Sequence, residues 1–268
     1  QSKEEMGELL VEADALLNET ANAAEGDTVT VLNTTSFTRN DVIYIDDAGK
    51  AVKGVPCQKV TKLDGSQKVA VANVTIPPLS AVSLELTDCV EEAPSPFTYS
   101  GKTLETPFAV VTFTEEGTIS SFFDKRAKRE LAGEGYPFNT FLLAEDVPLA
   151  WDNWDVDADV ELKFKPCAKL LSEEVVSDGA VEFRIRRKYQ LTEKSAVTQD
   201  MIFFANSPEV RFETLMHWYD NHRLLKTAFD TSVFCDFVRQ EIQFGYLKRP
   251  TTRNTTIEQA KFEVLNHK

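Results

Sequence analysis

The chain has 268 residues, of which 42% are hydrophobic and 27% are charged, and this composition is typical of a globular protein. No apolar run approaches the ~20 residues that a helix needs to cross a bilayer, so we expect no membrane association. With 29 Lys and Arg against 43 Asp and Glu, the net charge is −14, which disfavours nucleic acid and anionic membranes as partners and favours a neutral ligand.

The first predicted element is an amphipathic helix over residues 3–22. Its apolar residues recur at helical spacing among helix-favouring Glu and Ala: Met6, Leu9, Leu10, Ala13, Leu16 and Leu17. Such a helix needs a partner for its apolar stripe. We therefore expect residues 1–26 to be the end of an upstream helical region, left from a helical bundle.

From residue 28 the pattern changes to short β-prone runs separated by turn residues. The predicted strands are 28–33, 42–45, 55–60, 68–76 and 81–86. So many short strands in so few residues predict a small antiparallel β-sandwich over residues 27–90. The acidic and proline-bearing residues 91–97 are then interpreted as a linker.

Strand candidates continue through residues 98–268 without a long helical period. They are 108–113, 118–123, 138–143, 160–164, 169–176, 180–191, 196–204, 210–217, 227–233 and 242–246. A hairpin turn is expected at Glu115-Glu116-Gly117, and a short helix near residues 124–132. The predicted fold class is mainly β, with a small antiparallel β-sandwich followed by a large antiparallel β-sandwich.

The segment Trp151-Asp152-Asn153-Trp154-Asp155 holds two of the three tryptophans of the chain beside two carboxylates. An indole face suits the apolar face of a sugar ring, while Asp and Asn can orient its hydroxyls. Trp151, Asp152, Trp154 and Asp155 are therefore the candidate substrate-binding residues. The competing interpretation is that each tryptophan packs in the core.

Two further groups of polar residues are candidates for a metal site. On a strand, Asp155, Asp157 and Asp159 would share one face, which fits either a calcium site or, preferably, a solvated strand edge. His217 and His222 stand five residues apart, so on a strand they point to opposite faces. A structural or hydrogen-bonding role is preferred to a metal or acid–base role for this pair, and we expect no metal ligand in the chain.

The four cysteines, Cys57, Cys89, Cys167 and Cys235, lie far apart and show neither CxxC spacing nor a Cys/His pattern. We expect reduced thiols rather than zinc or redox chemistry. The chain begins without a basic and apolar leader, so we expect a cytoplasmic protein cut from a longer one. Walker A, GxGxxG, HExxH and GxSxG motifs are absent, which disfavours nucleotide, zinc-protease and serine-hydrolase functions.

Five separated segments, taken in order, resemble one family, the glycoside hydrolase family 38 α-mannosidases. They are residues 31–39 (VLNTTSFTR), 115–125 (EEGTISSFFDK), 151–156 (WDNWDV), 222–229 (HRLLKTAF) and 243–264 (QFGYLKRPTTRNTTIEQAKFEV). Each match alone is weak, but the ordered set extends over most of the chain. The sequence departs from the family pattern at Thr252, where His is usual.

The resemblance implies a retaining, zinc-dependent α-mannosidase whose catalytic Asp nucleophile, Asp acid/base and zinc ligands lie upstream, in an α/β barrel. No catalytic residue is then expected in this chain. The implied partners are that upstream catalytic barrel of the same chain and an α-mannoside or oligosaccharide substrate, with a homo-oligomer left open. Residues 222–226 are expected to be a packing loop.

Two other classes of function remain open from the sequence. A stand-alone carbohydrate-binding β-sandwich module would use the Trp151 segment as its own sugar site. A structural or subunit-contact module would instead expose a broad apolar patch where its partner is missing.

Overall fold

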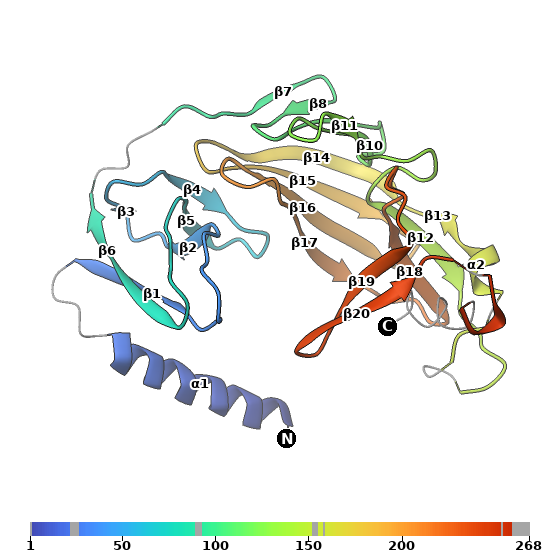
Figure 1. Cartoon of the computed structure of the whole chain (residues 1–268), viewed down its shortest axis with the longest axis horizontal. Coiled ribbons are helices and arrows are strands. Elements are labelled where there is room, and N and C mark those ends of the chain that lie inside the picture. Colours follow the sequence, from blue (N-terminus) through green and yellow to red (C-terminus); the bar gives the residue numbers. More distant parts are fainter. Residues whose placement is uncertain are drawn as a thin grey trace. The chain divides into compact units, whose positions relative to one another are not determined.

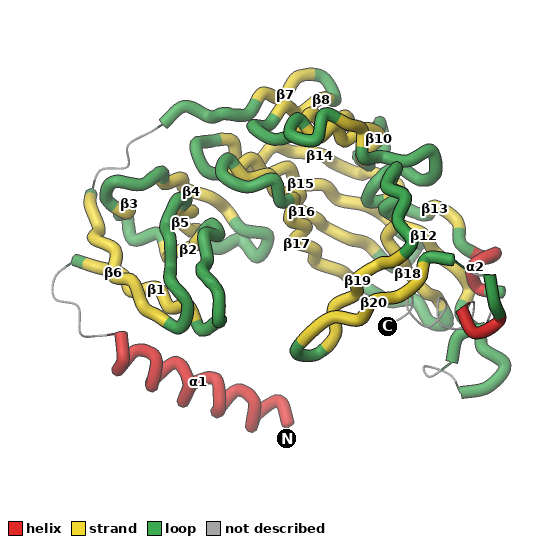
Figure 2. The backbone as a smooth tube through the Cα atoms, in the orientation of Figure 1, coloured by secondary structure: helices red, strands yellow, loops and turns green. Residues whose placement is uncertain are grey.

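A computed structural model describes residues 2–21, 27–88, 93–151, 155–157, 159–252 and 254–258, and it is mainly β (Figures 1 and 2). Its described helices are α1 (Ser2–Ala21) and the single turn α2 (Val160–Lys163). The chain forms two compact units: residues 1–98, 174–186 and 200–213 make the first, and residues 99–173, 187–199 and 214–268 make the second. No helix within the described ranges is long and apolar enough to cross a membrane.

The first unit contains the predicted small sandwich, built from two three-stranded antiparallel sheets. One sheet has the order β1-β6-β3 and the other the order β2-β5-β4. The strand bounds are β1 (Thr28–Asn33), β2 (Ile43–Asp46), β3 (Ala51–Val52), β4 (Cys57–Thr61), β5 (Gln67–Val71) and β6 (Ser80–Thr87). The prediction located five of these six strands to within a few residues and missed the two-residue β3.

Strand β5 is buried on both of its faces. Val69 and Val71 lie in the apolar core between the two sheets, together with side chains of β1, β2 and β6. Ala70 packs on the opposite side, in a second cluster with Val181 and Ile202. Alternate side chains of a strand point to opposite faces, so β5 joins two cores, which explains why its run is apolar without alternation.

A cluster of charges with a fully buried centre lies in the first unit around Arg184. Its guanidinium donates to Glu182 at 2.8 Å, to Asp200 at 3.0 Å and to Glu213 at 2.8 Å. The side chains of Arg184, Glu182 and Asp200 are all 0% exposed. Lys62 adds an ion pair to Glu213 at 2.7 Å. Buried charges are tolerated when they are paired and hydrogen-bonded in this way.

Gln58 of β4 links the small sandwich to the turn before β15. Its Oε1 accepts hydrogen bonds from the backbone N–H groups of Val181 and Glu182, both at 2.9 Å, and its Nε2 donates to Ser177 Oγ at 2.7 Å and to the Glu182 carbonyl at 3.0 Å. The approach is close enough that a Cβ at Gly179 would lie 2.5 Å from the Gln58 side chain. The side-chain amide of Gln58 therefore makes four hydrogen bonds that connect β4 with the turn before β15.

The second unit contains a five-stranded sheet, β11-β10-β9-β8-β7, a three-stranded sheet, β13-β12-β18, and the hairpin β19-β20. A four-stranded sheet, β14-β15-β16-β17, contributes part of each strand to each unit. The bounds are β7 (Thr98–Ser100), β8 (Thr103–Glu105), β9 (Ala109–Phe113), β10 (Ile119–Asp124), β11 (Arg129–Glu130), β12 (Thr140–Glu145), β13 (Lys165–Pro166), β14 (Lys169–Asp178), β15 (Glu182–Gln190), β16 (Ala196–Phe204), β17 (Val210–His217), β18 (Arg223–Ala228), β19 (Phe237–Ile242) and β20 (Gly245–Pro250).

The hairpin turn predicted at Gly117 is confirmed between β9 and β10, where Gly117 has φ +78°. The helix predicted near residues 124–132 is wrong. Asp124 Oδ1 accepts hydrogen bonds from the backbone N–H groups of Arg126 and Ala127, at 2.7 and 3.0 Å. This side-chain turn reverses the chain so that β11 pairs with β10, because a short polar side chain can replace the helical backbone bonds.

Three predicted strands are also wrong. Residues 227–233 include only the last two residues of β18, Arg223–Ala228. Residues 160–164 contain α2, whose single turn carries an ion pair between Asp159 and Lys163 at 3.1 Å. Residues 242–246 span the tip of the β19–β20 hairpin, because Ile242 pairs directly with Gly245 and leaves two residues for the turn. Apolar runs of this length do not distinguish a strand from a turn or a short helix.

Candidate functional site

The Trp151 segment connects β12 to α2 in the second unit. Trp151 is 75% exposed, so it does not pack in a core of the described residues, and its role in substrate binding stays a prediction. Its backbone has φ +62°, and the Trp151 carbonyl accepts a hydrogen bond from the Asp155 N–H at 3.0 Å. Asp152, Asn153 and Trp154 lie outside the described residues.

A tryptophan in the left-handed backbone region is uncommon, because the Cβ of an L-residue is crowded there. Strain of this kind persists only where the surrounding structure fixes it, and it occurs often at functional sites. In the same loop, Asp155 accepts from the Val156 N–H at 2.9 Å, and Asp157 from the Leu149 N–H at 3.3 Å. These bonds order the loop that carries the exposed Trp151.

Residues 155–157 are not in a strand, so the prediction that Asp155, Asp157 and Asp159 share one strand face is wrong. Asp155 and Asp157 hold the loop, and Asp159 pairs with Lys163. Within the part of the chain that the structure describes, no three His, Cys, Asp or Glu side chains gather as a metal site.

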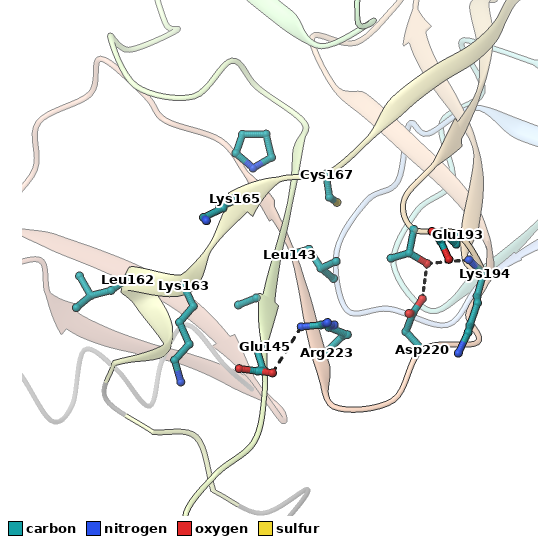
Figure 3. A pocket seen from close by; sticks show the side chains of 13 residues that line it. Leu143, Glu145, Leu162, Lys163, Lys165, Cys167, Glu193, Lys194, Asp220 and Arg223 are labelled. Atoms are coloured by element: carbon teal, nitrogen blue, oxygen red, sulfur yellow. Dashed lines mark hydrogen bonds and ion pairs between the residues drawn. The ribbon is translucent and has the colours of Figure 1, made fainter.

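An open cleft of about 740 Å³ is lined by residues of β12 and α2, the two elements that the loop with Trp151 connects, while Trp151 and Asp155 are not among its lining residues (Figure 3). The segment leaves β12 at Glu145 and returns to the chain at α2, and both elements line the cleft. The remaining wall comes from β13, from the turn between β15 and β16 and from the residues before and at the start of β18. The lining residues are Leu143, Ala144, Glu145, Leu162, Lys163, Lys165, Pro166, Cys167, Thr192, Glu193, Lys194, Asp220 and Arg223.

The cleft is lined by charges of both signs. Arg223 Nη1 lies 4.0 Å from Glu145 Oε1 across the β12–β18 pair. Asp220 Oδ2 accepts hydrogen bonds from the hydroxyls of Ser195 and Thr192, both at 2.5 Å. These hydroxyls hold the pKa of Asp220 below its usual range, because they stabilise the ionised form. Asp220 therefore fixes the 192–195 turn as an anion.

Cys167, on the floor of the cleft, is not a reactive thiol. Its Sγ donates to the Phe141 carbonyl at 3.5 Å, and burial raises its pKa to about 11. A thiol with so high a pKa stays protonated at neutral pH and is a poor nucleophile. Cys57 and Cys235 are also free thiols, while Cys89 lies outside the described residues.

The residues His217 and His222 do not assemble a metal site. His217 ends β17, and His222 precedes β18 with φ +51°. Asp220 between them already accepts the two hydroxyl hydrogen bonds described above. The zinc ligands that the sequence resemblance implies are expected outside this chain, and no step of chemistry at this cleft is assigned to a metal.

Most of residues 222–226 lie in β18, which pairs with β12, so the prediction of a loop is wrong. Leu225 packs beside the apolar cluster that contains Phe141 and Tyr189, and Lys226 Nζ lies 4.8 Å from the centre of the Phe164 ring. These contacts are those of the packing element that was predicted.

Sequence reasoning missed the charged walls of the cleft, Lys163, Lys165, Lys194 and Arg223. They come from four separate parts of the chain, and only Arg223 belongs to one of the motif segments, residues 222–229. Their proximity depends on the pairing of β12 with β13 and β18, which no local pattern in the sequence specifies.

The fold defines a mainly β protein of packed antiparallel sheets. Residues 104–268 match the family model described as the glycosyl hydrolases family 38 C-terminal domain. The chain therefore belongs to glycosyl hydrolase family 38, as the motif resemblance predicted.

The curated relatives that the chain matches are named as α-mannosidases. The chain is 34% identical over 167 residues to Alpha-mannosidase 2C1 of Homo sapiens, which covers 62% of this chain and 16% of the relative. It is 29% identical over 171 residues to Alpha-mannosidase G of Dictyostelium discoideum, with 62% and 16% covered. Alpha-mannosidase of Saccharomyces cerevisiae is 29% identical over 166 residues, with 59% and 15% covered. The match thus spans about one sixth of the length of these relatives.

Proposed function

We propose that this chain is a non-catalytic β portion of an α-mannosidase, and that its Trp151 segment forms part of the wall that contacts the α-mannoside substrate. The observation that carries the proposal is the family match over residues 104–268, supported by relatives whose names are α-mannosidases. The exposed Trp151 adds an indole face suited to a sugar.

In this proposal the Trp151 indole stacks on the apolar face of a mannose ring, and Asp155 accepts from a sugar hydroxyl. An indole face contributes contact area at low conformational cost, while a carboxylate fixes the orientation of a hydroxyl. Asp152 and Trp154 are proposed to share this role, on the sequence pattern alone.

The chemistry itself is assigned to the part of the intact enzyme outside this chain. There we propose an upstream catalytic barrel that holds zinc and hydrolyses the glycosidic bond with retention of configuration, for which two carboxylates about 5–5.5 Å apart are needed. A cytoplasmic location fits the free thiols of Cys57, Cys167 and Cys235, because reducing compartments keep thiols unpaired.

The test is steady-state hydrolysis of an aryl α-mannoside and of an α-linked mannobiose by the intact enzyme carrying Trp151→Ala. Loss of one stacking contact is expected to raise KM about tenfold for the mannobiose. The matched control is Leu149→Ala, because Leu149 is 95% exposed in the same loop and has no surface for stacking. Equal KM values for the wild type and both variants would remove Trp151 from the substrate-binding surface.

A second candidate function is a stand-alone carbohydrate-binding module, favoured by the fact that Trp151 and the cleft belong to one compact unit. Isothermal titration of residues 1–268 with mannose and mannobiose separates the two functions. Saturable binding without turnover would favour the binding module. Absence of binding is expected if the sugar site is complete only in the intact enzyme.

A further inference from the structure

The cleft of the second unit has a local excess of positive charge, although the chain is acidic. The chain as a whole has net charge −14, whereas cations outnumber carboxylates among the lining residues of the cleft. The cations are Lys163, Lys165, Lys194 and Arg223, and the carboxylates are Glu145, Glu193 and Asp220. A cleft with cationic walls attracts anions from solution, so this surface favours an anionic ligand.

Two of these cations have no carboxylate partner. Lys163 forms an ion pair with Asp159 at 3.1 Å. In contrast, Lys165 of β13 and Lys194 of the turn between β15 and β16 form no ion pair within the part of the chain that the structure describes. Both are exposed. Their ammonium groups are therefore available to an anion that enters the cleft.

Arg223 lies between Glu145 and Asp220 (Figure 3). Its Nη1 is 4.0 Å from Glu145 Oε1, which is too long for a hydrogen bond. Arg223 and Lys194 both contribute to lowering the pKa of Asp220, so these two cations lie close to the same carboxylate. A guanidinium presents a planar fork of N–H donors that matches a phosphate or a carboxylate.

The other lining residues separate this cleft from the usual surface for a neutral sugar. None of the described residues that line it is aromatic, whereas a neutral sugar ring is commonly held by stacking as well as by hydrogen bonds. The carboxylates of the cleft disfavour a ligand that is anionic throughout, but their oxygens accept hydrogen bonds from hydroxyl groups. These features together indicate a ligand with one compact anionic group and several hydroxyls.

We propose that the cleft binds a sugar phosphate, with its phosphate paired with Arg223 and Lys194 and its hydroxyls donating to the carboxylates of the cleft. A phosphomonoester has up to two negative charges and three acceptor oxygens at neutral pH, so it can pair with both cations, whereas a carboxylate offers a single charge. The volume of about 740 Å³ is that of a typical small-molecule site.

This site is separate from the proposed contact of Trp151 with an α-mannoside, because neither Trp151 nor Asp155 lines the cleft. The two proposals also fail independently. The KM for mannobiose tests Trp151, whereas the direct binding of a phosphorylated sugar tests the cleft.

The test is isothermal titration of the intact polypeptide with glucose 6-phosphate. Glucose is chosen because a mannose derivative would also compete for the α-mannoside site proposed elsewhere in the intact enzyme. We expect saturable binding that weakens as salt is added. Arg223→Gln and Lys194→Gln should each raise Kd about tenfold, because each removes one charged partner of the phosphate.

The matched control is Arg126→Gln. Arg126 belongs to the same unit, has a side chain that is 57% exposed and does not line the cleft, so its loss should leave Kd unchanged. Thermal unfolding of each variant checks that it is folded, and no loss is expected because all three side chains are exposed.

Glucose and inorganic phosphate are the two reference ligands. We expect no measurable binding of glucose, because it lacks the anionic group, and weaker binding of inorganic phosphate, because it lacks the sugar hydroxyls. Failure of glucose 6-phosphate to bind, or equal binding of glucose, would overturn the proposal. Inorganic phosphate bound as tightly as glucose 6-phosphate would overturn the assignment to a sugar phosphate. A Kd that both Arg223→Gln and Lys194→Gln leave unchanged would place the binding outside this cleft.

Discussion

The Arg184 cluster of the first unit and the cleft of the second unit use the same residue types for opposite purposes. Arg184, Glu182 and Asp200 are fully buried and paired with one another, so they offer nothing to a ligand. In the cleft, Arg223 and Glu145 lie 4.0 Å apart, with side chains 42% and 60% exposed. Buried charges that pair with one another stabilise the fold, whereas partly exposed charges at an open surface remain available for binding.

The largest expected effect comes from opening the buried cluster. Arg184→Met leaves the buried carboxylate of Glu182 without its Arg184 partner and that of Asp200 with Arg186 as its cation. Removal of one partner of a buried ion pair costs about 3–5 kcal/mol, and urea unfolding followed by circular dichroism would measure it. As a control, Arg126→Met removes only an exposed pair with Asp124, worth about 0–1 kcal/mol. Similar losses for both variants would contradict the comparison.

A smaller loss is expected when the bridge between β4 and β15 is removed. Gln58→Ala deletes a side chain with four hydrogen bonds and leaves backbone groups of the turn unpaired, which costs about 1–3 kcal/mol. Gln67→Ala is the matched control, because Gln67 accepts a single exposed bond from Thr61. The same unfolding measurement applies, and equal stability of the two variants would show that the bridge contributes little.

The buried cluster should also make stability depend on acid pH. Burial raises the pKa of Glu213, but the hydrogen bonds from Lys62 and Arg184 lower it by more than burial raises it. The pKa of Glu213 therefore lies below the ordinary 4.5. A carboxyl with a depressed folded pKa contributes stability that is complete above pH 4.5 and is lost as the pH falls through the folded pKa.

The measurement is thermal unfolding as a function of pH. Glu213→Gln should flatten the fall in stability below pH 4.5, whereas Glu209→Gln, which changes a carboxylate with a side chain 47% exposed, should leave the slope nearly unchanged. A slope unaffected by Glu213→Gln would remove this carboxyl from the acid response.

The smallest change in stability is expected at the open surface. Trp151→Ala removes a side chain that is 75% exposed, so the free energy of unfolding should change by no more than about 0.5 kcal/mol. Chemical denaturation measures this alongside the KM test described above. A loss of several kcal/mol would mean that Trp151 is structural, which would reverse its assignment to the binding surface.

Local sequence patterns predicted much of the β architecture for a physical reason. Alternating or continuous apolar runs such as residues 28–33, 196–204 and 210–217 match β1, β16 and β17 residue for residue. Residue types of this kind favour strands whatever their partners are. The patterns failed at residues 124–132, where the Asp124 side chain makes a turn, and at residues 160–164, 227–233 and 242–246, where short apolar runs lack a distinguishing period.

The candidate site was only partly predictable. The Trp151 segment is compact in sequence, so its residue types alone predicted a sugar-binding surface; Trp151 is exposed, and its role in binding stays a prediction. The proximity of the charged side chains in the cleft had no signal, because each side chain comes from a different part of the chain. Likewise, nothing in the sequence distinguished Arg184, which is buried, from Arg223, which is partly exposed.

The sequence by itself determined that the chain is mainly β and, through its ordered motifs, that it belongs to glycosyl hydrolase family 38, because hydrophobic periodicity and motif identity are local properties. Only the tertiary structure decided which charged side chains are buried and paired with one another and which line a cleft. That choice depends on strand pairings between residues far apart in the chain, such as β12 with β18, and on the burial that those pairings impose.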